Sequence, residues 1–141
     1  MTSTKNTTLQ DVQIFHETYG LPVLDRPNIQ DEKTNALRIN LLQEELDELK
    51  EALANNDIVE TLDALTDLQY VLDGAYLSFG LQHLKQIAFD EVQRSNLSKL
   101  GQDGKPIRRE SDGKVMKGPN YFAPDLKAII DNDTNAVEEA A

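Results

Sequence analysis

The fold is decided by two acidic stretches, LLQEELDEL at residues 41–49 and ETLDALTDL at residues 60–68. In both stretches leucines recur at the three- and four-residue spacing of an amphipathic helix. The sequence between them, Asn55-Asn56-Asp57, is a turn that ends in a good helix cap. Two helices joined by so short a connection pack as antiparallel neighbours. We therefore predict a helical hairpin that carries acidic groups on both of its helices.

Helical phase places several of these acids on the apolar side of their helices. At about 100° per residue, Glu45 falls inside the leucine stripe and Glu48 on its edge, whereas Asp47 points to solvent. Glu60, Asp63 and Asp67 share one narrow strip of the next helix, and Gly74 continues this strip and is expected to leave open space. Because buried carboxylates are costly unless something neutralises them, the pattern indicates a bound divalent cation.

Some of these acids could instead have ordinary structural roles. Glu60 could complete a capping box with Asp57, and Glu44 could pair with a surface lysine. Arg38 or Lys50 could form an ion pair with one carboxylate, but not with the whole set.

The type of metal follows from the ligand chemistry. Oxygen ligands on helices suit Mg²⁺ or Mn²⁺ and do not match a calcium-binding loop. Neither His16 nor His83 follows a glutamate by three residues, which excludes the di-iron bundle pattern and leaves the histidines without assigned chemistry.

Composition excludes several classes of protein. The net charge of −11 argues against broad affinity for nucleic acids or anionic membranes. The chain has no cysteine, so it has neither disulfides nor a thiolate site. No apolar run reaches the roughly 20 residues that span a bilayer, and the polar N-terminus does not resemble a secretory signal. We therefore expect a cytoplasmic protein.

The chain length of 141 residues is that of one domain, and its pattern predicts an all-α antiparallel bundle followed by an irregular C-terminal segment. The domain is expected over residues 1–128, with a disordered acidic tail over 129–141. The helices are expected at about Leu9–Tyr19, Asn28 or Gln30 to Asn55, Asp57–Phe79, and Gln82 to Leu97 or Leu100. The third of these is apolar nearly all round, which indicates burial inside the subunit or at a subunit interface.

The segment after the fourth helix is basic. Residues 94–117 contain seven bases and three acids, whereas residues 44–73 contain ten acids and one base. A basic loop segment is suited to binding phosphate groups. It could equally be a solubilising loop, or it could pair with the acidic helices.

These motifs, in this order, resemble a known family. Glu44-Glu45-x-x-Glu48, followed by an acidic motif on the next helix, is similar to the MazG-like all-α nucleoside triphosphate pyrophosphohydrolases. Residues 63–71, 89–99 and 112–119 resemble the phosphoribosyl-ATP pyrophosphohydrolase-like branch of that family.

The resemblance implies a Mg²⁺-dependent reaction, with Mn²⁺ as a substitute, that converts a (d)NTP and water to a (d)NMP and pyrophosphate. It implies catalytic roles for Glu44, Glu45 and Glu48, and it draws the metal ligands from Glu44, Glu45, Glu48, Asp63 and Asp67. The implied phosphate-binding residues are Arg94, Asn96, Lys99, Lys114 and Lys117. One departure from the family pattern is that the usual apolar run follows Asp67 and not Asp63, which makes Asp67 the safer ligand and leaves Glu60 in doubt.

The resemblance also implies a homodimer or homotetramer with composite sites. Small members of the family occur in phages, which would place this enzyme in a host cytoplasm, and some resemble enzymes selective for dGTP or GTP. Two alternatives stay open: a non-enzymatic helical oligomer, and the same enzyme class acting on dUTP or a phosphoribosyl nucleotide.

Overall fold

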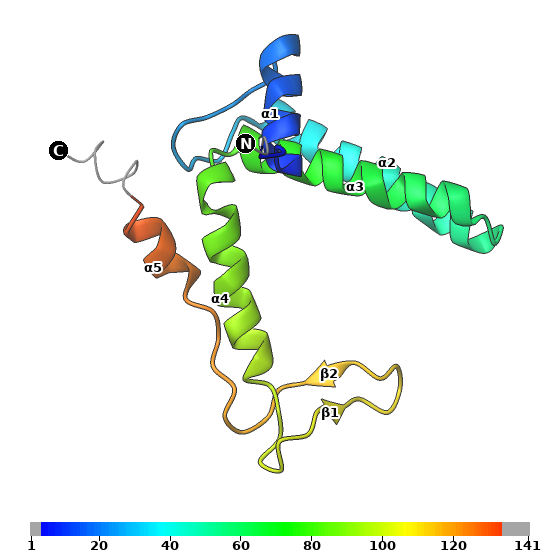
Figure 1. Ribbon diagram of the computed structural model, residues 1–141, viewed down its shortest axis with the longest axis vertical. Helices are drawn as coiled ribbons and strands as arrows, with labels where there is room; N and C mark the ends of the chain where they lie inside the picture. Colours follow the sequence, from blue (N-terminus) through cyan, green and yellow to red (C-terminus); the bar gives the residue numbers. More distant parts are fainter. Residues whose placement is uncertain (1–3, 134–141) are drawn as a thin grey trace. The chain divides into compact units, whose positions relative to one another are not determined.

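The computed structural model describes residues 4–133 and divides into two compact units, one ending at His83 and one beginning at Leu84 (Figure 1). The first unit contains α1 (Thr8–Tyr19), α2 (Glu32–Ala54) and α3 (Ile58–Ser78). A short 3₁₀ helix, Gln82–Leu84, leads to the second unit, which contains α4 (Lys85–Leu97), β1 (Ile107–Arg108), β2 (Val115–Met116) and α5 (Leu126–Asp131). The all-α fold class predicted from the sequence is confirmed.

The first unit is built on α2 and α3, which lie side by side (Figure 1). The turn between them contains Asn56 at a positive φ of 51°, and the Asp57 amide donates to the Ala52 carbonyl at 3.0 Å. The buried residues Ala52 and Ala64 lie on α2 and α3, and both are small, which allows the two helices to approach closely. α1 packs on α3 and buries Val12 and His16.

Side-chain caps fix where the helices of this unit begin. Thr7 caps α1 and forms a reciprocal capping box with Gln10. Asp31 caps α2 by accepting from the Thr34 amide at 2.7 Å, so this helix begins later than the expected Asn28 or Gln30. In both cases the helix begins directly after a residue whose side-chain oxygen accepts a hydrogen bond from a first-turn amide that would otherwise be unpaired.

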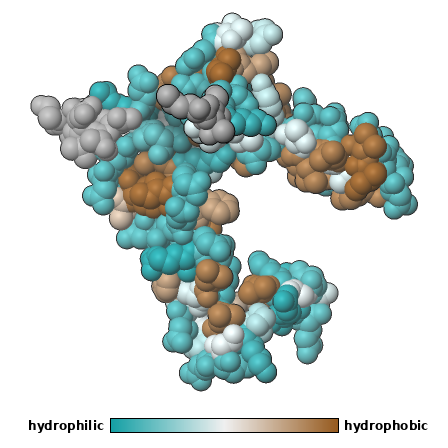
Figure 2. Space-filling model, in the orientation of Figure 1, coloured by the Kyte–Doolittle hydropathy of each residue, from teal (hydrophilic) through white to brown (hydrophobic). Residues whose placement is uncertain are grey.

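The apolar surface of α3 is only partly covered by the other helices of the first unit. Ile58, Val59, Leu62 and Leu65 have exposed fractions of 77%, 69%, 67% and 51%. In Figure 2 the hydrophobic colour gathers at the end of the α2–α3 pair, near the turn that joins the two helices. Within the first unit, α1 and α2 therefore cover only part of the circumference of α3.

In the second unit the chain folds back along α4 after the hairpin. β1 and β2 pair antiparallel, with Ile107 opposite Met116. The Ser95 hydroxyl donates to the Phe122 carbonyl at 2.8 Å. Gly118 lies against the backbone of α4's C-terminal extension, where a Cβ atom would be 2.2 Å from the Leu100 oxygen. The basic segment thus forms the end of α4 and the β1–β2 hairpin. The irregular stretch that follows, residues 117–125, runs back along α4 and is hereafter called the return segment.

The sequence did not predict α5. Asp125 caps it by accepting from the Ala128 amide at 3.0 Å, directly after Pro124. The helix crosses the predicted domain boundary at residues 128 and 129, and Asp133, assigned to the expected tail, is buried. The remainder of that tail, residues 134–141, lies outside the described residues. Within residues 4–133, no helix combines the length and the apolar character required to cross a membrane.

Glu91 of α4 joins the return segment to the helix, and the strength of this contact depends on pH. Hydrogen bonds from Arg94, and then from the Asp125 amide, lower the pKa of Glu91 to about 2. Its stabilising effect is therefore present above the unfolded pKa of about 4.3 and is lost as pH falls towards 2. We expect Glu91→Gln to lower the melting temperature by a few degrees at pH 7, and this difference to shrink steadily below pH 4.

The measurement is a series of thermal melts between pH 2 and pH 7. Asp90→Asn is the matched control, because Asp90 is an exposed carboxylate of the same helix that accepts a hydrogen bond from the Gln86 side chain. A Glu91→Gln effect of the same size at every pH would contradict the assignment.

Candidate metal centre

Three carboxylates from α2 and α3 converge at one point. One oxygen each from Glu45, Glu48 and Asp67 lies within 4.8 Å of the other two. These residues are hereafter called the carboxylate cluster. A donor set made only of carboxylate oxygens is the kind that Mg²⁺ and Mn²⁺ prefer, with waters or phosphate oxygens completing the shell.

The helical register explains why these three groups meet. Glu45 and Glu48 are three residues apart on α2 and so point from one face of that helix. Asp67 is three residues from the buried Ala64 on α3, so it also points towards the helix pair. Glu45 and Asp67 are half-buried and Glu48 is exposed, which leaves the cluster open on one side.

The electrostatics of Glu45 fit a cation ligand. Its Oε2 atom is buried and has no hydrogen-bond partner among the described residues. Burial, followed by the negative charges of Glu48 and Asp67, raises the pKa of Glu45 above its ordinary value, and Asp63 adds to this effect. A buried carboxylate oxygen with no protein donor, next to two further carboxylates, is placed where a divalent cation would be stabilising.

The other two predicted ligands lie outside the cluster. Glu44 is exposed on α2. Asp63 is also exposed, one turn before Asp67, and it lies in a neighbouring pocket. The sequence therefore identified the three residues that converge but could not separate them from two neighbours of the same type.

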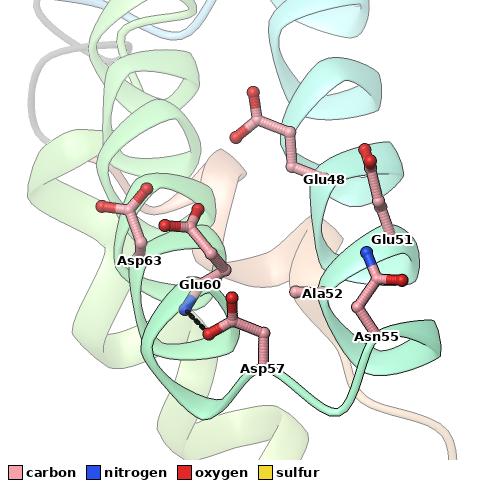
Figure 3. Close-up of a pocket in the computed structure, with 7 residues that line it drawn as sticks. All are labelled: Glu48, Glu51, Ala52, Asn55, Asp57, Glu60 and Asp63. Carbon is pink, nitrogen blue, oxygen red and sulfur yellow. Dashed lines mark hydrogen bonds between the residues drawn. The ribbon is translucent and has the colours of Figure 1, made fainter.

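The neighbouring pocket measures about 390 Å³ and lies towards the turn (Figure 3). Its lining residues are Glu48, Glu51, Ala52, Asn55, Asp57, Glu60 and Asp63. Figure 3 shows Glu48 and Glu51 on α2 and Glu60 and Asp63 on α3, the four acidic side chains that these two helices contribute to the pocket lining. Since Glu48 belongs to both, the acidic surface runs without interruption from the carboxylate cluster to the hairpin tip.

The structure separates the two possible roles of Glu60. Its backbone amide donates to the Asp57 carboxylate at 3.1 Å, which is one half of a capping box. The other half is absent, because the Asp57 amide donates to the Ala52 carbonyl instead. The Glu60 carboxylate thus takes no part in the cap and faces the acidic pocket (Figure 3).

Sequence reasoning missed a buried group two helical turns from the carboxylate cluster. Arg38 of α2 and His16 of α1 are 5% and 2% exposed, and both lie over Gly74 of α3. A Cβ atom at Gly74 would be 2.7 Å from Arg38 Nη1 and 3.0 Å from His16 Nε2, so the expectation of open space beside this glycine is wrong. The sequence signal for this group was a spacing of seven residues, or about two helical turns, from Arg38 to Glu45 and from Asp67 to Gly74. This spacing places Arg38 on the same face of its helix as Glu45, and Gly74 on the same face as Asp67.

The predicted phosphate-binding residues belong to the second unit. The Arg94 guanidinium forms two hydrogen bonds with Glu91, at 2.7 and 3.0 Å, and lies 4.3 Å from the centre of the Phe122 ring. Lys117 lies over the Tyr121 ring at 4.8 Å. Among residues 4–133, Lys99 and Lys114 have no side-chain ion pair, and Asn96 contributes its backbone carbonyl to the end of α4.

Comparison with known proteins identifies the family. A family model described as phosphoribosyl-ATP pyrophosphohydrolase matches residues 12–96. The chain belongs to this family. The match includes the carboxylate cluster, Arg38 and Asn96, and ends before Lys99, Lys114 and Lys117. The family predicted from the sequence motifs is confirmed.

Two individual proteins are also similar. Uncharacterized protein L479 of Acanthamoeba polyphaga mimivirus is 31% identical over 133 residues, which is 92% of this chain and 50% of that protein. The chain thus spans about half the length of this relative. A solved protein proposed to be an NTP pyrophosphohydrolase, from Exiguobacterium sp. 255-15, is 27% identical, with a TM-score of 0.47 over 97% of this chain and 98% of that one.

The raised pKa of Glu45 predicts a stability effect with a definite sign. The folded protein disfavours the charged carboxylate, so this side chain costs stability as pH rises through its folded pKa. Without added metal, we expect Glu45→Gln to raise the melting temperature by a few degrees at pH 7 and to have no effect at pH 4. Added Mg²⁺ should stabilise the wild-type protein and leave the variant unchanged.

Thermal melts with and without Mg²⁺ at both pH values test this expectation. Asp47→Asn is the control, because Asp47 is an exposed carboxylate on the same helix and accepts a hydrogen bond from the Gln43 side-chain amide. Equal stabilisation of the wild-type and Glu45→Gln proteins by Mg²⁺ would remove Glu45 from the ligand set.

Proposed function

We propose that this protein is a Mg²⁺-dependent nucleoside triphosphate pyrophosphohydrolase that converts a (d)NTP and water to a (d)NMP and pyrophosphate. The observation that carries the proposal is the carboxylate cluster, formed by α2 and α3 in a chain of a nucleotide pyrophosphohydrolase family. Glu45, Glu48 and Asp67 would hold the cation, and Mn²⁺ would substitute for Mg²⁺. We place the reaction in the cytoplasm.

When bound, the cation supplies charge that neutralises phosphate oxygens and lowers the pKa of a coordinated water. Glu44 is exposed directly beside Glu45 on α2, so its carboxylate is available to orient the attacking water and accept its proton. The water oxygen bonds to the α-phosphorus, the bond from that phosphorus to the bridging oxygen breaks, and pyrophosphate leaves with the electron pair. Asp63 and Glu60 extend the acidic surface and are candidates to bind a further cation.

The negative charge of the triphosphate also requires protein cations. We assign this role to Lys99, Lys114 and Lys117, with Asn96 as a hydrogen-bond donor. Arg94 is the weakest member of the predicted set, because its guanidinium already binds Glu91 through two hydrogen bonds. A contact with phosphate would compete with that pair.

We propose a purine nucleotide, dGTP or GTP, as the substrate. The family description leaves a phosphoribosyl nucleotide as the alternative, and dUTP stays a further one. A non-enzymatic helical oligomer is the rival from another class. It does not account for three carboxylates within 4.8 Å of one another.

We also propose that the protein is a homodimer or a homotetramer. The support is the exposed apolar surface of α3 near the turn, where Leu62 and Leu65 are more than half exposed. A monomer would leave this surface in water, at an approximate cost of 25 cal/mol for each Å².

The oligomer proposal predicts a change of assembly state. The double variant Leu62→Lys/Leu65→Lys should shift the measured mass to that of the monomer, because two charges would then be buried in the interface. Light scattering coupled to size-exclusion chromatography is the measurement, and Leu46→Lys, an exposed position on α2, is the control. A wild-type mass equal to that of one chain would contradict the proposal.

The enzyme proposal is tested with a panel of (d)NTPs in the presence of Mg²⁺ or Mn²⁺, by measuring monophosphate and pyrophosphate release. Asp67→Asn should reduce kcat/KM at least about 100-fold, because the amide keeps the shape of the side chain and removes a charged ligand. Its circular dichroism and oligomeric mass should match those of the wild-type protein. Full activity of Asp67→Asn would exclude it as a ligand, and no turnover of any nucleotide would disprove the enzyme proposal.

A further inference from the structure

Arg38 is a buried cation that has no partner in the described part of the chain. Its side chain is 5% exposed, and its Nε atom is buried without a hydrogen-bond acceptor. An arginine stays charged in proteins, and a buried charge without a partner is strongly destabilising. The Nε–H group of Arg38 lacks an acceptor among the described residues, although His16 Nε2 lies near Nη1.

The position of Arg38 relates it to the carboxylate cluster. It precedes Glu45 by seven residues on α2, and Gly74 follows Asp67 by seven residues on α3. Seven residues are nearly two full turns, or about 10 Å, along a helix. Because Gly74 contacts Arg38 just as Asp67 meets Glu45, the guanidinium lies on the same side of the helix pair as the cluster, about two turns away.

The ring of His16 lies beside the guanidinium of Arg38. His16 Nδ1 lies 2.9 Å from the Pro22 carbonyl, so Nδ1 carries the proton and Nε2 is left as an acceptor beside the guanidinium. Burial lowers the pKa of His16, and the charge of Arg38 lowers it further, which keeps the ring neutral. The absence of a side chain at Gly74 leaves room for the guanidinium, since a Cβ atom there would be 2.7 Å from Arg38 Nη1.

A second group with an unused atom lies one turn away. Asn35 precedes Arg38 by three residues on the same face of α2, and its amide nitrogen donates to the Gln30 carbonyl at 3.0 Å. Its Oδ1 atom is buried without a donor among the described residues. A charged donor and an amide acceptor, both buried and both unused, thus lie next to each other on one helix face.

We propose that Arg38, with Asn35 beside it, binds the base of the nucleotide whose phosphates lie at the carboxylate cluster, and that it selects guanine. This inference rests on the proposed function. A nucleoside extends from its α-phosphate by about the distance that separates the two sites. Guanine presents the adjacent O6 and N7 acceptors that arginine binds with two hydrogen bonds, and its N1–H can donate to an amide oxygen. Adenine has an amino group in place of O6, which would oppose the guanidinium.

The test compares two substrates that differ in the base. We expect Arg38→Met to lower the ratio of kcat/KM for dGTP to that for dATP by roughly 10- to 100-fold, the discrimination that a bidentate base contact provides. Arg38→Lys should give an intermediate loss, because it keeps the charge and loses the planar fork. Methionine fills a similar volume, and replacing a buried charge with an apolar side chain is usually tolerated by the fold. Lys33→Met, at an exposed position of α2, is the control.

Binding of nucleosides separates this inference from the enzyme proposal. Calorimetry with 2′-deoxyguanosine and 2′-deoxyadenosine, without metal, should show preferential binding of deoxyguanosine that Arg38→Met abolishes. This result would support the inference even if no nucleotide were hydrolysed. An equal loss of activity on dGTP and dATP would assign Arg38 to a phosphate and overturn the inference. A change in oligomeric mass with an unchanged substrate ratio would assign it to a carboxylate of a second copy, with the same consequence.

Discussion

The repulsion among carboxylates placed between α2 and α3 is the constraint on which the first unit depends. Glu45, Glu48 and Asp67 have oxygens within 4.8 Å of one another, and one oxygen of Glu45 is buried without a donor among the described residues. Alone, this arrangement costs free energy, since each buried charge loses water and repels its neighbours. It persists because the tight turn at Asn56 and the small side chains between the helices hold α2 and α3 together. Strain of this kind is common where a site is built for a ligand.

The described part of the chain places its charges unevenly around that pair of helices. The carboxylate cluster and the acidic pocket occupy the half of the α2–α3 pair nearest the turn, whereas the buried Arg38 and the buried Asp73 lie in the half nearest α1. One end suits a cation with phosphates, and the other suits a neutral group rich in hydrogen-bond acceptors. A nucleotide likewise has charged phosphates at one end and a neutral base at the other, which matches the two halves of the helix pair.

The apolar surface of α3 bears on stability as well as on assembly. A thin core, made of small residues such as Ala52 and Ala64, leaves large side chains such as Ile58 and Leu62 exposed at the end of the helix pair (Figure 2). If a second copy covers this surface, the stability of the fold depends on protein concentration. The geometry of the carboxylate cluster would then depend on assembly too, because α3 carries both Asp67 and the exposed leucines.

The sequence by itself determined the four long helices to within a few residues, the Asp57 cap and the family, because these depend on local spacing: leucine periodicity, Asp57 before a helix, and the paired glutamates of α2. It also indicated that Glu45 and Asp67 point inwards. Only the tertiary structure decided which acids converge, since Glu44 and Asp63 have the same chemistry as the cluster and differ only in where helix packing directs them. The same holds for Arg38, His16 and Gly74, which come from three helices. It also holds for Arg94, whose partner Glu91 accepts a hydrogen bond from the Asp125 amide of the return segment. Helical phase is a property of one segment, whereas the contact between two side chains depends on how separate segments pack, and no local pattern records that.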